Sequence, residues 1–308
     1  MDEGTPETAL LAIDWGTTTA RAYAVDAAGN IRDTRSGALG VQQVSGDFPA
    51  ALDALLGDWR TLAVPRIAAG MIGSRQGWVE AKYVECPADF EALGNDLATT
   101  PGGELAIVPG LLYRDSSGVP DVMRGEETQL AGAVHPGEES VLAVLPGTHS
   151  KWARVEHGRL MAFQTHMTGE LYSVLLAHSI LGRLAAPAGA GHANGAAFTR
   201  GVERGLSAGA LSHLVFGARS LALTGALEAD EVRDWLSGLL IGYEIRHAAA
   251  WAAGSGPTIS HVRVIGADVL VDRYADALQA AGIVAERGPA DAAVRGLHRI
   301  ARLARLVA

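Results

Sequence analysis

The chain has 308 residues, which is enough for two domains of about 150 residues each. Hydrophobic residues make up 48% of the sequence and charged residues 19%, proportions typical of a globular protein and not of a disordered one. The formal net charge of −9 argues against nucleic acid or an anionic membrane as the main partner. The single cysteine, Cys86, excludes an intramolecular disulfide and a structural zinc site built from cysteines. An acidic N-terminal segment, and the lack of any apolar run of about 18 residues, indicate a cytoplasmic protein without a membrane span.

The first predicted strand leads into a short glycine-threonine turn. Asp14 ends this strand, and the turn reads Gly16-Thr17-Thr18. Such a turn can hold a polyphosphate, because backbone N–H groups and hydroxyls face the anion while the aspartate faces its metal ion. Neither a P-loop nor a dinucleotide fingerprint follows the strand. We therefore predict phosphate contacts for Gly16, Thr17 and Thr18, and magnesium coordination for Asp14.

The rest of the first half alternates predicted strands and helices. Leu52, Leu55, Leu56 and Trp59 recur at helical spacing and predict a helix over residues 48–60. The other elements expected in this half are strands over 9–14, 19–26, 30–36, 66–70 and 105–109, and a helix over 125–134.

The second half repeats this order of elements. A strand over 141–145 leads into a second glycine-threonine turn, Gly147-Thr148, and Thr168 is a predicted N-cap of a later helix. A turn-rich stretch at 135–139 separates the copies, which predicts domains over 1–135 and 136–308. The two turns are expected to form two walls of one nucleotide site. The other elements expected here are strands over 151–156, 159–164 and 262–265, helices over 269–281 and 291–305, and a helical insertion over 183–258.

Several motifs carry a resemblance to known kinases. The run from Asp14 to Arg21, DWGTTTAR, is similar in spacing to the first phosphate motif of glycerol-kinase-like sugar kinases, and the two hairpins resemble the actin/hexokinase/Hsp70 superfamily. Four longer stretches together resemble the 2-dehydro-3-deoxygalactonokinase family over nearly the whole chain, except in the predicted insertion. These stretches are AAGMIGSRQGW (68–78), DVMRGEETQLAGA (121–133), LPGTHSKW (145–152) and MTGELYSVL (167–175).

The resemblance implies a fold and an activity. The fold would be α/β, with two ribonuclease-H-like (actin-like ATPase) domains, an interdomain cleft and a helical insertion in the second domain. The activity would be transfer of a phosphoryl group from ATP, with Mg²⁺, to the 6-hydroxyl of the sugar acid 2-keto-3-deoxygalactonate in galactonate catabolism.

The resemblance also implies roles for individual residues. Arg21 would stabilise phosphate charge, Gly147 and Thr148 would make the second phosphate contact, and Gly266 would contact adenosine. The substrate would contact Arg75, Gln76 and Trp78, with Arg124 a second candidate for its carboxylate. Glu126 aligns with the catalytic acid of a Gly-Asp-Gln element, which makes it the candidate base, with Glu127 as the alternative.

Simpler interpretations exist for several of these residues. Two glutamates in the first turn of a helix also complement the helix dipole, and Asp268 could be only an N-cap. His149 and Lys151 are expected to share one face of a strand, so both would point into the site or both outward. His166 is the one histidine that we would place near the substrate.

Two other functions remain open at this point. The chain could phosphorylate another sugar or keto-deoxy acid, or it could be an actin-like ATPase that is not a kinase. A sugar-responsive repressor would need an N-terminal DNA-binding helix pair, which the sequence does not indicate. The sequence also leaves open whether the substrate is a galactonate or gluconate derivative, and whether the protein forms a homo-oligomer.

Overall fold

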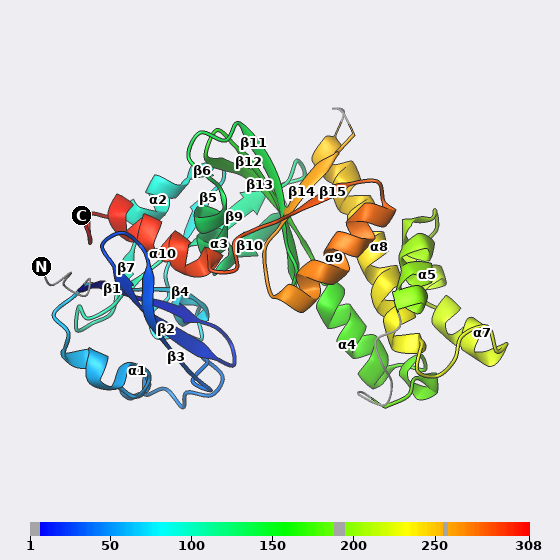
Figure 1. Cartoon of the computed structure of the whole chain (residues 1–308), viewed down its shortest axis with the longest axis horizontal. Coiled ribbons are helices and arrows are strands. Elements are labelled where there is room, and N and C mark those ends of the chain that lie inside the picture. The colour runs from blue at the N-terminus through cyan, green and yellow to red at the C-terminus, as the bar shows by residue number, and fades with distance from the viewer. Residues whose placement is uncertain (1–6, 188–194, 255–257) are drawn as a thin grey trace, which may run out of the picture. The chain divides into compact units, whose positions relative to one another are not determined.

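The computed structural model describes residues 7–187, 195–254 and 258–308, and the chain folds as two compact units (Figure 1). Among the described residues, unit 1 comprises 7–141, 155–163 and 291–308. Unit 2 comprises the described parts of 142–154 and 164–290. No helix in the described part of the chain is long and apolar enough to cross a membrane.

Unit 1 is built on a six-stranded mixed sheet with the order β3-β2-β1-β4-β8-β7. The central strand β1 is antiparallel to β2 and parallel to β4. Residues 10–13 of β1 are fully buried, as expected for a strand covered on both faces. The bounds are β1 (Thr8–Trp15), β2 (Ala20–Asp26), β3 (Ile31–Gly37), β4 (Arg66–Gly70), β7 (Ala98–Thr99) and β8 (Ala106–Ile107).

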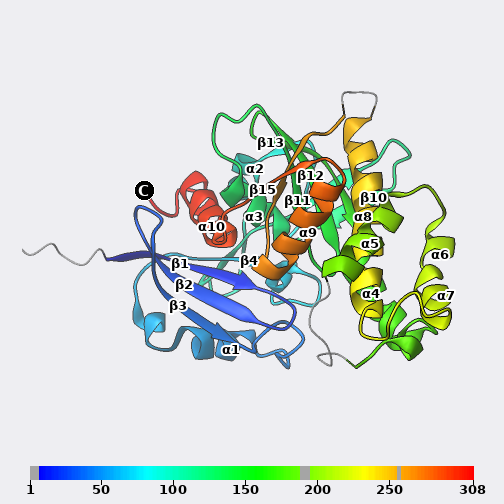
Figure 2. The ribbon, with the colours of Figure 1, turned by 45° about the vertical axis from the view of Figure 1, so that its right-hand side comes forward.

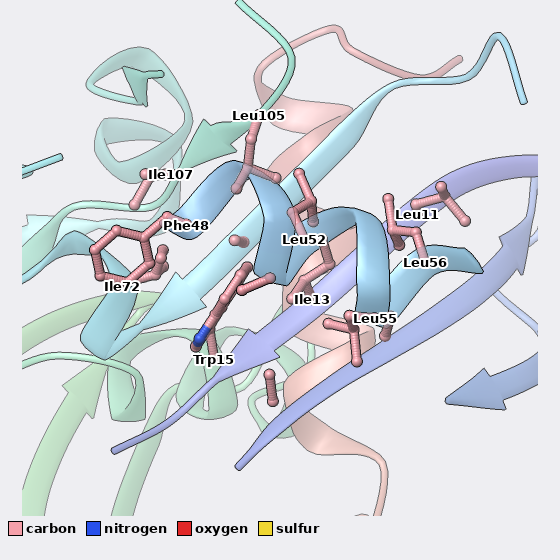
Figure 3. Packing of buried hydrophobic residues seen from close by; sticks show 14 of the residues in the cluster. Leu11, Ile13, Trp15, Phe48, Leu52, Leu55, Leu56, Ile72, Leu105 and Ile107 are labelled. Carbon is pink, nitrogen blue, oxygen red and sulfur yellow. The ribbon is translucent and has the colours of Figure 1, made fainter. Parts of the chain in front are cut away.

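Helix α1 (Phe48–Leu56) forms the core of unit 1 against one face of this sheet (Figure 3). The helix begins where the Asp47 carboxylate accepts a hydrogen bond from the Ala50 N–H (3.1 Å), an N-cap that satisfies a free backbone donor. Its apolar side chains pack on Leu11, Ile13 and Trp15 of β1. The α-helix ends at Leu56 and a 3₁₀ helix (Gly57–Thr61) follows, so the helix predicted over 48–60 is two shorter helices.

Helices α3 (Glu126–Ala133) and α10 (Ala292–Leu303) pack closely together within unit 1. A Cβ atom on Gly296 would lie 1.8 Å from the Thr128 carbonyl oxygen, and one on Gly132 would lie 2.0 Å from the Ala292 carbonyl oxygen. The Arg299 guanidinium donates to two carbonyl groups at the C-terminal end of α3. This packing places residues 291–308 in unit 1, whereas the sequence predicted one domain over 136–308.

Smaller elements complete unit 1. A three-stranded sheet has the order β10-β9-β5, and α10 also contacts the short helix α2. The bounds are β5 (Tyr83–Glu85), β9 (Gly110–Arg114), β10 (Pro120–Met123), α2 (Phe90–Asn95) and a 3₁₀ helix (Met71–Gly73).

The third sheet has the order β15-β14-β11-β12-β13-β6. Strand β11 is parallel to β14, which in turn is parallel to β15. If the two-residue strand β6 is left out and the strands of each sheet are counted in order of appearance, both large sheets contain the run third, second, first, fourth strand (Figures 1 and 2). The bounds are β6 (Ala88–Asp89), β11 (Ser140–Leu145), β12 (Ser150–Glu156), β13 (Arg159–His166), β14 (His261–Val264) and β15 (Val284–Arg287).

Helices make up most of unit 2. The long helix α8 lies against α5, and a Cβ atom on Gly201 would come within 2.1 Å of the Trp235 carbonyl oxygen. The described residues between 183 and 258 form helices joined by turns, while 188–194 and 255–257 lie outside the described residues. The bounds are α4 (Thr168–His178), a 3₁₀ helix (Gly182–Leu184), α5 (Gly195–Leu206), α6 (Leu211–Leu214), α7 (Gly217–Leu223), α8 (Val232–Ala253) and α9 (Asp268–Ala280).

Candidate active site

The first turn (residues 16–18) joins β1 to β2 in unit 1. The Gly16 N–H donates to the Thr19 carbonyl (2.9 Å) and closes the hairpin. The register of β1 and β2 places Arg21 directly opposite Asp14. Thr18 is exposed and Thr17 half-buried, so solvent reaches the turn.

A loop at residues 40–42 holds the first turn in place through backbone hydrogen bonds. The backbone N–H groups of Gly40, Val41 and Gln42 donate to the carbonyl groups of Thr18, Gly16 and Thr17 at 3.0–3.1 Å. A Cβ atom on Gly40 would lie 2.3 Å from backbone atoms of Thr18. Only glycine fits at residue 40, and the sequence had not suggested a role for it.

Three polar side chains lie together beside the first turn. Burial raises the pKa of the Asp14 carboxyl, and the Arg21 guanidinium partly offsets this rise. Tyr23 hydrogen-bonds to Arg21, and burial together with the Asp14 charge raises the pKa of the Tyr23 hydroxyl. Tyr23 was not among the predicted site residues.

The N-terminus of α3 is close to Asp14. Gly70, at the end of β4, has a φ of +94°, and a Cβ atom there would lie 3.7 Å from the Asp14 Oδ1. A Cβ atom on Gly125, just before α3, would lie 3.4 Å from the Gly70 Cα. The structure thus brings the predicted metal ligand and the predicted base helix together.

The two glutamates at the start of α3 differ in their surroundings. Glu127 is fully buried, and its carboxylate accepts from the Gly125 N–H (2.6 Å) and the Thr128 hydroxyl (3.0 Å). Burial, with the neighbouring charge of Glu126, raises the pKa of Glu127 to about 7. Glu126 is only half-buried, and its carboxylate accepts from the Arg124 N–H (3.1 Å). Solvent therefore reaches Glu126 but not Glu127.

Arg124 lies just ahead of these glutamates. One guanidinium nitrogen, Nη2, donates to the Ala81 carbonyl (2.7 Å), and the guanidinium carbon lies 4.4 Å from the centre of the Tyr83 ring. Among the described residues, its Nε and Nη1 atoms are buried and have no hydrogen-bond partner. Burying a hydrogen-bond donor without an acceptor costs free energy, so these two nitrogen atoms are candidates for binding a ligand.

The other predicted substrate residues are in the loop after the 3₁₀ helix Met71–Gly73. Arg75 and Gln76 are exposed there. The Trp78 ring instead stacks on Phe48 of the unit 1 core, with ring centres 6.3 Å apart and an interplanar angle of 12°. The structure therefore groups Arg75 with Gln76 and places Trp78 with the core.

The second turn (residues 147 and 148) follows β11 in unit 2, and the start of α4 supports it. A Cβ atom on Gly169 would lie 2.5 Å from the Gly147 carbonyl oxygen, and the Glu170 N–H donates to the Thr148 carbonyl (3.0 Å). A Cβ atom on Gly147 itself would meet no other atom within 4 Å. Thr148 is exposed.

His149 and Lys151 do not share an environment, so that prediction was wrong. Strand β12 begins only at Ser150, so His149 lies between the second turn and the strand. The exposed His149 ring pairs with the Glu170 carboxylate (2.5 Å), whereas Lys151 is buried. His166 is half-buried, with its Nε2 atom 3.1 Å from the Gln164 side-chain oxygen.

Gly266 lies next to the second turn. A Cβ atom there would lie 3.7 Å from atoms of Pro146, because the parallel strands β11 and β14 end side by side. Two N-cap predictions in this region were wrong. Asp268 is the first residue of α9, whose N-cap is Ala267, and Thr168 is the first residue of α4, whose N-cap is Met167.

A cavity of about 180 Å³ in unit 2 adjoins the second turn. Gly147, Gly169, Tyr172, Ser237, Leu270 and Arg273 contribute to its wall. The Arg273 guanidinium is fixed by the Asp234 carboxylate (2.5 Å) and the Ser237 hydroxyl (3.0 Å). A larger, mostly apolar cavity of about 590 Å³, also in unit 2, includes none of the predicted site residues.

Comparison with known proteins places the chain in a family. A family model described as 2-keto-3-deoxy-galactonokinase matches residues 14–300. The 2-dehydro-3-deoxygalactonokinase of Escherichia coli (strain K12) is 38% identical over 274 residues, covering 88% of this chain and 90% of that enzyme. A protein of Rhizobium meliloti (strain 1021), named as a probable 2-dehydro-3-deoxygalactonokinase, is 40% identical over 298 residues, covering 94% and 96%.

A solved structure agrees with these relatives. The crystal structure of a Sinorhizobium meliloti protein described as a 2-dehydro-3-deoxygalactonokinase is 38% identical, has a TM-score of 0.86, and covers 95% of this chain and 98% of its own. The chain belongs to the 2-keto-3-deoxy-galactonokinase family, as its motifs predicted. It is therefore a phosphotransferase with a mixed α/β fold.

Proposed function

We propose that the protein transfers the γ-phosphoryl group of ATP to the 6-hydroxyl of 2-dehydro-3-deoxy-D-galactonate. The observation that carries this proposal is the placement of Glu126, a solvent-accessible carboxylate on the helix that begins beside Asp14 and the first turn. A phosphate turn and an accessible carboxylate in one unit are the parts that a kinase needs to bind a phosphoryl group and orient an acceptor hydroxyl. The strand order shared by the two large sheets supports the ribonuclease-H-like (actin-like ATPase) fold expected from the motifs.

The two turns would contact the polyphosphate of ATP. Both present backbone and threonine hydroxyl groups to solvent, and Arg21 adds a positive charge at the first turn. The cavity beside Gly147 suits the adenosine end, because Tyr172 and Leu270 offer apolar surface and Ser237 offers a hydroxyl. Gly266 lies close to the same turn and supports this position.

Mg²⁺ fits the residues at the first turn. This ion commonly takes one or two carboxylates and completes its shell with phosphate oxygens and water. Asp14 supplies one such carboxylate, and the described residues include no group of three or more His, Cys, Asp or Glu that could hold a metal alone. The bound ion would neutralise charge on the phosphates.

Glu126 would be the general base that accepts the proton of the acceptor hydroxyl. Phosphoryl transfer passes through a loose transition state, so the base chiefly orients the hydroxyl. Glu127 is fully enclosed by protein and cannot reach a substrate. Its role would be to hold the N-terminus of α3 through the Gly125 N–H.

The substrate carboxylate would bind the arginines of unit 1. Arg124 has two guanidinium nitrogens without protein partners among the described residues. After a small side-chain movement, the substrate carboxylate would accept hydrogen bonds from both of them. The exposed Arg75 would add a second charge from its loop. Arg124→Lys should therefore raise the KM for the sugar acid more than Arg75→Lys does, because lysine lacks the planar fork.

The acceptor specificity is tested by a coupled assay of ADP release. The panel contains 2-dehydro-3-deoxygalactonate, its gluconate epimer, galactonate, galactose and a blank without acceptor. We expect the highest kcat/KM with 2-dehydro-3-deoxygalactonate. Equal ADP release without acceptor would identify an ATPase, and a higher value with another acid would replace the proposed substrate.

The base assignment is tested by Glu126→Gln. Loss of a general base costs about 10²–10⁴ in kcat, while the KM for the sugar acid should stay close to the wild-type value. Glu127→Gln is the matched control, since it removes the neighbouring charge but not the proposed base. A near-normal kcat in Glu126→Gln would remove Glu126 from this role.

A further inference from the structure

A buried glutamate on α8 in unit 2 has no part in the chemistry described so far. Glu244 is 1% exposed, and its carboxylate accepts hydrogen bonds from three side chains. The donors are the Trp152 indole N–H (2.7 Å), the Tyr274 hydroxyl (2.8 Å) and the Thr168 hydroxyl. The Ser150 hydroxyl lies 2.8 Å from that of Tyr274 and extends the network.

These donors come from the elements that surround the second turn. Ser150 and Trp152 lie on β12, directly after the turn. Thr168 is the first residue of α4 and precedes Gly169 and Glu170, whose backbones contact the turn. Thr168 and Tyr274 also line the cavity beside Gly147. One carboxylate thus joins β12, α4 and α9 to α8.

The energetics of burial argue that this carboxylate has a positional role. A buried carboxylate is costly unless hydrogen bonds satisfy it, and an apolar side chain of similar volume would often pack at least as well. Burial raises the pKa of the Glu244 carboxyl, and its hydrogen-bond donors oppose that rise. Because its oxygens act only as acceptors, they fix the direction of every donor that meets them.

We propose that Glu244 is a positioning residue for the second turn. It holds Thr168 at the start of α4, so that Gly169 and Glu170 keep the backbone of Gly147 and Thr148 in place for the nucleotide phosphates. Glu244 itself does not touch the nucleotide. This inference rests on the proposed function, in which the second turn binds phosphate.

The test compares Glu244→Gln with Asp26→Asn. Glutamine keeps the size of the side chain but replaces one acceptor oxygen with an NH₂ group that cannot accept from the donors. We expect the KM for ATP and the calorimetric Kd for ADP to rise about tenfold, which corresponds to about 1.4 kcal/mol. The KM for the sugar acid should change by less than about twofold, because that substrate is bound by groups of unit 1.

Asp26 is the matched control, since it is also a buried carboxylate with several donors. It lies at the end of β2 and accepts from the backbone N–H groups of Ala28 (3.0 Å) and Asn30 (2.8 Å) and from Arg32. Asp26→Asn should lower the Tm and leave the KM for ATP unchanged. The contrast separates positioning of the turn from a general loss of stability.

Three outcomes would decide the matter. An unchanged KM for ATP in Glu244→Gln, with a lowered Tm as in Asp26→Asn, would overturn the positioning role. If Glu244→Gln does not fold, Trp152→Phe takes its place, because it removes one hydrogen-bond donor to Glu244 that is not in the cavity wall. This variant should raise the Kd for ADP about threefold. An unchanged Kd for ADP would overturn the positioning role. A wild-type protein that binds no ADP would overturn the proposed function itself.

Discussion

The two glycine-threonine turns have the same kind of support but different chemistry. Behind each turn lies a glycine that no other residue can replace. A Cβ atom on Gly40 would lie 2.3 Å from Thr18, and one on Gly169 would lie 2.5 Å from the Gly147 carbonyl oxygen. In both units the turn is thus fixed by close backbone contact.

The charged residues distinguish the turns. Asp14 and Arg21 flank the first turn, and the residues at the same positions around the second turn are Leu145 and Trp152, both buried. At the second turn, the buried Glu244 accepts a hydrogen bond from Trp152. Under the proposed function, the first turn would therefore carry the groups that act on the phosphoryl group. Under the proposed function, the second turn would hold the nucleotide through its backbone.

The largest expected effect is at Asp14, beside the first turn. Asp14→Asn should lower kcat by about 100-fold or more, because it removes the carboxylate proposed to hold the ion that stabilises the transition state. The measurement is kcat over a range of Mg²⁺ concentrations. Leu145→Met, at the same position of the other turn, is the control and should keep kcat within about threefold. Similar losses in both variants would contradict the division of roles.

The buried glutamate of unit 1 should make stability depend on pH. Its pKa rises from 4.5 to about 7 in the folded protein, so between these pH values the folded state keeps a proton that the unfolded state has lost. The stability from Glu127 is therefore present below about pH 4.5 and is lost as the pH rises through about 7. Glutamine cannot ionise and avoids this loss.

Denaturant unfolding of Glu127→Gln and wild type checks this expectation. Relative to wild type, the free energy of unfolding of the variant should increase by about 3 kcal/mol between pH 4.5 and pH 8. A difference between the two proteins that does not change with pH would show that Glu127 titrates normally.

Two glycine substitutions distinguish a residue within a turn, Gly147, from a residue that supports a turn, Gly40. A Cβ atom on Gly147 meets nothing within 4 Å, so Gly147→Ala should keep the wild-type Tm and still raise the KM for ATP about tenfold by blocking phosphate. Gly40→Ala should instead lower the Tm, because its Cβ collides with Thr18. Thermal unfolding and ATP titration distinguish the two effects. A normal KM for ATP in Gly147→Ala would show that phosphate does not approach this residue.

The smallest expected effect is at Tyr23. Its hydroxyl hydrogen-bonds to Arg21, so Tyr23→Phe should lower kcat by about threefold, the net contribution of one ordinary hydrogen bond. Tyr113→Phe, a residue whose ring lies 6.0 Å from that of Phe163 in unit 1, is the control. Equal kcat values in the two variants would show that Arg21 does not need the tyrosine.

Local sequence patterns predicted much of this molecule. The strands β1 (Thr8–Trp15) and β11 (Ser140–Leu145) follow from their apolar runs, and the family follows from its motifs. The helix expected over 125–134 is observed as α3. These features depend on neighbouring residues, which the sequence displays directly.

The features that were missed depend on contacts between distant residues. Gly40 is constrained by Thr18 through a loop, and Glu244 meets Thr168 across 76 positions of sequence. An isolated glycine or glutamate gives no sign of such a contact. Thr168 also shows how tertiary structure overrides a local preference, because its hydroxyl donates to Glu244 instead of capping α4.

Phosphorus-31 NMR of the wild-type protein with ATP, Mg²⁺ and 2-dehydro-3-deoxygalactonate tests the central claim most directly. We expect the γ-phosphate signal to be replaced by one phosphomonoester signal on the 6-hydroxyl of the sugar acid, in equal amount to the ADP formed. Release of inorganic phosphate in place of that phosphomonoester would contradict the assignment of a sugar-acid kinase.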